Sequence, residues 1–248
     1  MATQPDQAVT DFCEQVNPRL LFEMRSGRDK PDIRIQQSWL ALRERRALLW
    51  LAWNTPARVN FDHLTVLGFA AQIAAGALYA LARFDRLALI GVIFCLALNW
   101  LGDSLDGTLA RVRQRQRPRY RFYVDHMVDT FGALPLMIGL GASGYMNSWI
   151  AMGLLLGFLV LSIQSYLATH TLGEFRLSFW RLGPTELRIL LAIGNLALFW
   201  KPTAHLFGHA YRLFDVGGVI GILGMTAMAI AFTVKNTARL YREERIPE

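Results

Sequence analysis

Charged residues and cysteines are scarce in this chain of 248 residues. Only 18% of the residues are charged, whereas an average soluble domain carries about 25%. A chain that is 53% hydrophobic and contains 15 Phe is too apolar to be disordered. The two cysteines, Cys13 and Cys95, are too few for a disulfide-stapled secreted fold, so we expect free thiols. Residues 1–15 lack a basic start followed by an apolar core, so we expect no signal peptide.

Long apolar runs dominate the chain after residue 60. Most of them are long enough to cross a hydrocarbon core of about 30 Å. They cover Leu64–Leu81, Leu87–Asp103, Tyr123–Leu140, Trp149–Ala168, Leu187–Trp200 and Val216–Val234. The pattern predicts an all-α membrane bundle with about six transmembrane helices. Asn195, inside the fifth and shortest run, is expected to form a hydrogen bond across helices.

The residues before the first run are more polar. Residues 1–33 read as a cytosolic tail, and Ile35–Trp53 predicts an amphipathic helix that ends before Pro56. Its mixture of Trp and Arg favours a helix lying in the membrane interface, although an ordinary soluble helix is the alternative. We therefore expect three parts: residues 1–60 with this helix, a transmembrane domain at 61–236, and a cytosolic tail at 237–248.

The positive charge is distributed unevenly between the two ends of the expected spans. Lys and Arg number 26 against 19 Asp and Glu, which gives a net charge of +7. With six spans, all but Arg83, Arg86, Lys201 and Arg212 lie on the same side as both termini. The positive-inside rule then places both termini in the cytoplasm, and we expect a bacterial inner membrane. This distribution explains most of the charge without nucleic acid as a partner.

Four aspartates mark the cytoplasmic ends of the second and third runs. Asp103 and Asp106 are three residues apart, and Asp125 and Asp129 are four apart, so each pair shares one helix face. Side-by-side packing of the two helices would bring four carboxylates into one small volume. Their repulsion favours a hard divalent cation, Mg²⁺, Mn²⁺ or Ca²⁺, and two bridged ions are plausible for phosphoryl transfer.

The residues around these aspartates suit phosphate. Gly107 lets the backbone approach a ligand closely, and Arg111 offers a forked contact to phosphate oxygens. The segment RVRQRQRPRYR at 111–121 carries an arginine at every second position. Its later arginines are expected to anchor the loop to anionic lipid headgroups.

The stretch DSLDGTLAR at 103–111, followed by DHMVD at 125–129, resembles the signature of the CDP-alcohol phosphatidyltransferase family. That signature is D-x-x-D-G-x-x-A-R, a loop, and G-x-x-x-D-x-x-x-D. The opening of the first run, FDHLTVLG, also looks like the family's. The resemblance implies an all-helical membrane bundle, usually a homodimer, whose site opens to the cytosol and the bilayer.

The resemblance also implies roles for individual residues. Asp103, Asp106 and Asp125 would hold Mg²⁺ or Mn²⁺, and Asp129 would contact the metal and act as general base. The residues expected to line the CDP site are Gly107, Ala110 and Arg111. The implied reaction moves a substituted phosphate from a CDP-linked lipid or alcohol donor to an alcohol acceptor and releases CMP.

Two features depart from the family pattern. The glycine expected four residues before Asp125 is Arg121, and the loop from Arg111 to Asp125 is about one residue longer than usual. Arg121 could narrow the nucleotide pocket or bind phosphate. An inactive relative that acts as a structural partner is therefore one alternative. A divalent-cation transporter is another, although Arg111 beside the carboxylates opposes a cation path.

Acceptor contacts are expected near the start of the fifth run, at GPTE (183–186). Pro and an acidic residue there are ordinary helix-start signals. A similarity to the choline/ethanolamine phosphotransferase branch implies instead that Glu186 contacts an acceptor hydroxyl or an amine. Arg176, Arg181 and Arg188 either hold an anionic acceptor or belong to the cytoplasmic excess of positive charge.

Overall fold

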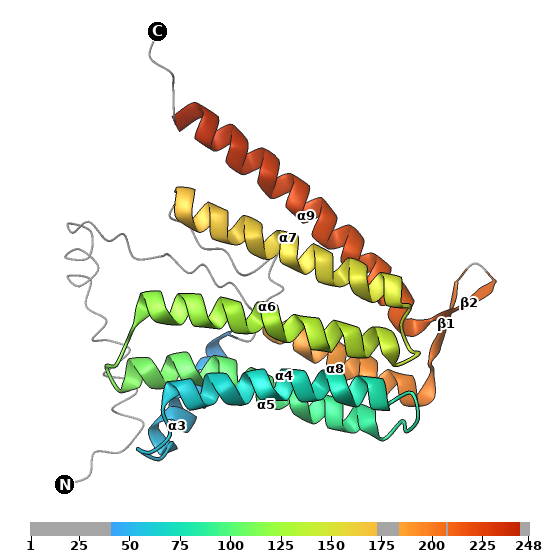
Figure 1. The fold of residues 1–248 in the computed structure, drawn as a ribbon, viewed down its shortest axis with the longest axis horizontal. Helices are drawn as coiled ribbons and strands as arrows, with labels where there is room; N and C mark the ends of the chain where they lie inside the picture. Colours follow the sequence, from blue (N-terminus) through green and yellow to red (C-terminus); the bar gives the residue numbers. More distant parts are fainter. Residues whose placement is uncertain (1–40, 173–183, 207, 244–248) are drawn as a thin grey trace.

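The computed structural model describes residues 41–172, 184–206 and 208–243, and these residues are mostly helical (Figure 1). The helices are α3 (Ala41–Asn54), α4 (Phe61–Leu81), α5 (Ala88–Val112), α6 (Pro118–Ala142), α7 (Ser148–Leu172), α8 (Pro184–Trp200) and α9 (Leu213–Glu243). A small antiparallel hairpin, β1 (Thr203–Leu206) and β2 (His209–Arg212), joins α8 to α9. The helical fold class is confirmed, and the hairpin is a feature that the sequence pattern did not predict.

Each of the six apolar runs forms a helix, and among the described residues four helices are long and apolar enough to cross a membrane: α4, α5, α7 and α9. The other two fall short for different reasons. α8 is apolar but has only 17 residues. α6 has 25 residues, but charged residues, among them Arg121, Asp125 and Asp129, lie in its first half.

Successive helices run in opposite directions through the bundle (Figure 1). The turn between α5 and α6 and the end of α9 lie at the left of this view. The connections from α4 to α5 and from α6 to α7, together with the hairpin, lie at the right. Such an antiparallel order is expected when consecutive helices of one chain cross the same membrane one after another.

α4 packs closely against both α5 and α6 through glycines. A Cβ added at Gly76 would overlap the Pro135 carbonyl, and one added at Gly139 would overlap the Gly76 carbonyl. Nearer the start of α4, a Cβ added at Gly102 would lie 2.8 Å from Gly68 Cα. Small residues at such crossings let the helix backbones touch, which is how apolar helices gain packing energy in a bilayer.

The main core lies between α4, α5, α6 and α8. Tyr79, Leu89 and Leu198 are fully buried within it. Asn195 donates a hydrogen bond from Nδ2 to Tyr79 Oη at 2.9 Å, which confirms the expected polar link between helices. Cys95 is a buried free thiol, as expected, whereas Cys13 lies outside the described residues.

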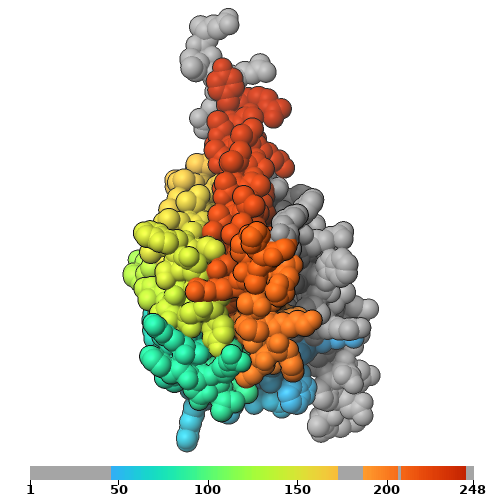
Figure 2. Space-filling view, turned by 90° about the vertical axis from the view of Figure 1, so that its right-hand side faces the viewer, coloured from blue at the N-terminus to red at the C-terminus, as the bar shows by residue number. Residues whose placement is uncertain are grey.

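α9 lies on the outside of the bundle along α7. Phe214 and Gly218 are its buried residues, and both lie in its first two turns. Gln164 of α7 donates from Nε2 to the Ala229 carbonyl at 3.2 Å. Figure 2 shows α9 in red at the centre of the view, with its far end projecting beyond the neighbouring helices.

α3 packs on the end of α5 at the side of the bundle. It ends at Asn54, two residues before Pro56, as the helix-breaking property of proline predicts. Its buried residues Leu48 and Ala52 join a small core with Leu105 and Leu109 of α5. The expected start of this helix, residues 35–40, lies outside the described residues.

Arg113 holds the connection between α3 and α4. Its guanidinium donates to the carbonyls of Val59 at 2.5 Å, Pro56 at 2.9 Å and Thr55 at 3.0 Å. The expectation that the later arginines of segment 111–121 reach lipid headgroups therefore fails for Arg113. Three backbone carbonyls of the connection between α3 and α4 take up its donors instead.

Arg113→Ala should loosen α3 without affecting the rest of the bundle. Hydrogen bonds from a charged group contribute about 1.5–3 kcal/mol each, so losing three should destabilise the docking of α3 by at least about 2 kcal/mol. Limited proteolysis in detergent should cut the α3–α4 connection several times faster than in the wild type. Arg115→Ala, an exposed neighbour, is the matched control. Equal cleavage rates in all three proteins would contradict this role for Arg113.

Candidate active site

The four aspartates come together where α5 ends and α6 begins. Asp103, Asp106 and Asp125 line one small pocket, to which α4 contributes Thr65. The pocket is also lined by Gly68, Phe69, Asn99 and Val128. Asp129 lies one helical turn beyond Asp125 and interacts electrostatically with the other three carboxylates. The three- and four-residue spacings thus place acidic side chains from two antiparallel helices around one volume.

Asp106 is the most enclosed of these carboxylates. Its side chain is 3% exposed, and Thr65 Oγ1 donates to its Oδ2 at 2.9 Å. Asn99, also buried in the pocket wall, donates from Nδ2 to the Gly68 carbonyl at 3.0 Å. Thr65 and Asn99 were not predicted as site residues, because a single hydroxyl or amide inside an apolar run carries no distinctive spacing.

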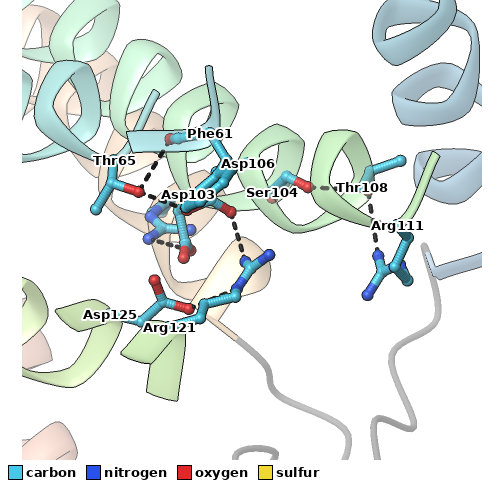
Figure 3. Close-up of polar contacts among 10 residues, drawn as sticks. Phe61, Thr65, Asp103, Ser104, Asp106, Thr108, Arg111, Arg121 and Asp125 are labelled. Atoms are coloured by element: carbon cyan, nitrogen blue, oxygen red, sulfur yellow. Dashed lines mark hydrogen bonds and ion pairs between the residues drawn. The ribbon is translucent and has the colours of Figure 1, made fainter. Parts of the chain in front are cut away.

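Arg121 lies between two of the aspartates (Figure 3). Its Nη2 is 2.5 Å from Asp106 Oδ1, and its Nε is 2.9 Å from Asp125 Oδ2. The guanidinium lies directly over Gly107, so that a Cβ on Gly107 would overlap it. Burial would lower the pKa of Arg121, but the neighbouring carboxylates of Asp106 and Asp125 raise it above the usual value. Arg121 therefore stays charged in this position.

A second arginine pairs with the remaining carboxylate of the pocket. Arg188 of α8 donates from Nη2 to Asp103 Oδ2 at 2.9 Å. The position of Arg188 in the sequence suited either a contact with an anionic acceptor or the cytoplasmic excess of positive charge. In the structure it is an ion-pair partner for the site, which links α8 to α5 across 85 residues of sequence.

The expected nucleotide-contacting residues of α5 differ in their surroundings. Gly107 is buried beneath Arg121, and Ala110 is also buried. Arg111 is exposed and donates from Nη2 to Thr108 Oγ1 at 3.3 Å, apart from the carboxylates (Figure 3). Of these three residues, Gly107 is the one that adjoins the acidic pocket directly.

The other substrate-contacting candidates are described only in part. Arg176 and Arg181 lie outside the described residues. Glu186 belongs to the first turn of α8, which begins at Pro184 as the helix-start signals predict, but its side chain lies outside the described residues.

Aromatic rings cover the side of α6 that faces α7. The His126 ring stacks on Tyr166 with ring centroids 4.9 Å apart, and Phe122 packs edge-on against His126 at 4.3 Å. This cluster fixes the α6 turn that carries Asp125. The sequence does not predict a role for His126, because its partner Tyr166 lies on another helix.

The donor chemistry of the site suits a hard divalent cation, since carboxylate oxygens are the ligands that Mg²⁺ and Mn²⁺ prefer. Among the described residues, however, no group of three or more His, Cys, Asp and Glu side chains is arranged to hold an ion. Arg121 and Arg188 bind three of the four carboxylates instead. With all four carboxylates ionised, the two guanidinium groups would leave two negative charges uncompensated, which one divalent ion would balance.

No protein-family model matches this chain, and no curated protein matches it.

Proposed function

We propose that this protein is an integral-membrane, metal-dependent phosphotransferase that acts on a CDP-linked donor. It would transfer a substituted phosphate from CDP-diacylglycerol or a CDP-alcohol to an acceptor hydroxyl and release CMP. The single observation that carries the proposal is the meeting of Asp103, Asp106 and Asp125 in one pocket between antiparallel α5 and α6. The resemblance of segments 103–111 and 125–129 to the family signature supports the choice of donor.

In this reaction, the acceptor oxygen forms a bond to the β-phosphorus of the donor. The bond from that phosphorus to the bridging oxygen breaks, and CMP leaves with the electron pair. Asp129 takes the proton of the acceptor hydroxyl, as a carboxylate within hydrogen-bond reach can do. Asp103, Asp106, Asp125 and Asp129 would hold Mg²⁺ or Mn²⁺, which when bound offsets the negative charge of the pyrophosphate.

The proposed location follows from the helices. α4, α5, α7 and α9 are long and apolar enough to cross a bilayer, and α6 and α8 would complete six spans. The carboxylates lie toward the end of α5 and the start of α6, at one end of the bundle, where a lipid substrate and a water-soluble one can meet. The distribution of Lys and Arg supports a cytoplasmic site and cytoplasmic termini. The family resemblance separately implies a homodimer.

Three alternatives concern the same residues. Transfer of a CDP-choline- or CDP-ethanolamine-derived phosphate to diacylglycerol reverses which substrate is the lipid. An inactive relative is favoured by Arg121, which pairs with two of the carboxylates that the reaction needs. Cation transport is opposed by the same arginine and by Arg188, since both add positive charge beside the aspartates.

A donor panel tests this proposal directly. Purified protein in lipid nanodiscs is incubated with labelled CDP-diacylglycerol or CDP-choline, with and without Mg²⁺, and with a set of alcohol acceptors. We expect CMP to form with one donor class, only when the divalent ion is present. Absence of CMP with every donor would overturn the enzymatic proposal, and the productive donor would identify the branch.

A further inference from the structure

We infer that Arg121 takes the place of a cation between Asp106 and Asp125, so that a divalent ion and this guanidinium compete for the two carboxylates. The inference deepens the proposed function, because it concerns the occupancy of the same site. It predicts that the metal affinity of this protein is set by an internal positive charge rather than by the carboxylates alone.

The first support is the bridging geometry. Arg121 of α6 reaches Asp106 Oδ1 of α5 through Nη2 and Asp125 Oδ2 of its own helix through Nε, so its guanidinium lies between carboxylates of the two helices. Carboxylate oxygens from two helices thus converge on one positive group. A bridging metal ion would need oxygens from these same two side chains.

The second support is the space made for the guanidinium. A Cβ on Gly107 would overlap the Arg121 guanidinium. Because Gly107 has no side chain, α5 leaves room for this guanidinium. The other oxygen of Asp106 accepts from Thr65 Oγ1. Asp106 therefore has both oxygens engaged while Arg121 is in place, and an ion bound at Oδ1 would lie beside the positive charge of this guanidinium.

The third support is that Arg121 can leave without moving a helix. Its side chain is 22% exposed, whereas that of Asp106 is 3% exposed, so the arginine lies at the mouth of the pocket and the aspartate inside it. Arg121 belongs to the first turn of α6, beside the connection to α5. Rotation about its side-chain bonds is enough to carry the guanidinium outward, where its planar donors suit a phosphate group.

Binding of Mn²⁺ alone tests the competition. The wild type, Arg121→Ala, Arg121→Gln and Arg121→Lys are titrated with Mn²⁺, and the free ion is measured by electron paramagnetic resonance. Removal of the charge in the Ala and Gln variants should tighten Mn²⁺ binding by about tenfold or more, since a cation next to the site opposes a second one. The Lys variant keeps the charge and should stay within about threefold of the wild type.

Arg117→Ala is the matched control, since it removes an exposed positive charge from the same segment. It should leave the Mn²⁺ affinity unchanged. Arg121→Gln keeps much of the side chain's length and can still donate hydrogen bonds, so it serves if Arg121→Ala does not fold. Mn²⁺ should also raise the melting temperature of the Ala and Gln variants more than that of the wild type, because a tighter ligand stabilises the folded state more.

The outcomes separate this inference from the proposed function. Equal or weaker Mn²⁺ binding by both uncharged variants, or no Mn²⁺ binding by any of the proteins, overturns the competition. An active wild type whose Mn²⁺ affinity does not respond to Arg121 overturns the inference and leaves the transferase proposal intact. Tighter binding by the uncharged variants, with no CMP release by the wild type from any donor, supports the inference and removes the proposed reaction.

Discussion

Asp129→Asn should lower CMP release by roughly 10²–10⁴-fold, the range that a positioned general base contributes. Asparagine has nearly the same shape as aspartate but does not accept the proton of the acceptor hydroxyl. Asp129 interacts electrostatically with Asp103, Asp106 and Asp125, so removing its charge also relieves repulsion within the group. The variant should therefore fold and still bind the donor.

Asp62→Asn provides the matched control for this prediction. Asp62 is an exposed carboxylate in the first turn of α4, and its substitution should leave CMP release within about twofold of the wild type. Melting temperatures in detergent should agree for all three proteins. Near-normal CMP release by Asp129→Asn would show that another group accepts the proton.

Gly139→Val should be the most destabilising single substitution at the helix contacts described above. A Cβ at this position would overlap the backbone carbonyl of Gly76, which has no flexible side chain to move aside. Overpacking of this kind costs about 1–3 kcal/mol, and contact with backbone places the effect at the upper end or beyond. Reversible unfolding in mixed detergent micelles should show the loss as an earlier transition.

Gly224→Val separates packing from the general cost of valine in a helix. Gly224 lies on the exposed side of α9, and a Cβ built there meets no atom within 4 Å. Its substitution should shift the unfolding transition by no more than about 0.5 kcal/mol, the range for surface changes. Equal shifts of the unfolding transition in Gly139→Val and Gly224→Val would mean that α4 and α6 can move apart at Gly139 without loss of stability.

Much of the fold follows from local properties of the sequence. Apolar runs gave the positions of six helices because length and hydropathy are properties of one segment. Pro56 and Pro184 set helix boundaries through their own backbone geometry. The hairpin after α8 was not predicted, since its two strands have four residues each, which is too short for an alternating pattern to be distinctive.

The part of the site that could be predicted is the set of residues that share a helix face. Spacings of three and four residues place Asp103 with Asp106 and Asp125 with Asp129, whatever surrounds them. They do not specify the cations that these carboxylates meet. The ion pair between Arg188 and Asp103 depends on how α8 packs beside α5, which no local signal encodes.

The arginines of segment 111–121 show the same limit. Their even spacing makes them equivalent in the sequence, and the expectation of headgroup contacts treated most of them alike. In the structure, Arg113 donates to backbone carbonyls, Arg121 pairs with carboxylates and Arg111 donates to Thr108. Each of these contacts depends on the direction of the end of α5 and the start of α6, which is determined only by the packing of the bundle.

The glycine contact between α4 and α6 also determines how the pocket can widen. Gly76 lies 11 residues from Thr65 along α4, or about 16 Å at the rise of an α-helix. Backbone pressed against backbone at Gly76 and Gly139 prevents one helix from sliding past the other. We therefore expect the two helices to splay from this pivot, so that a bulky substrate is admitted by a small tilt of their ends while the core stays packed.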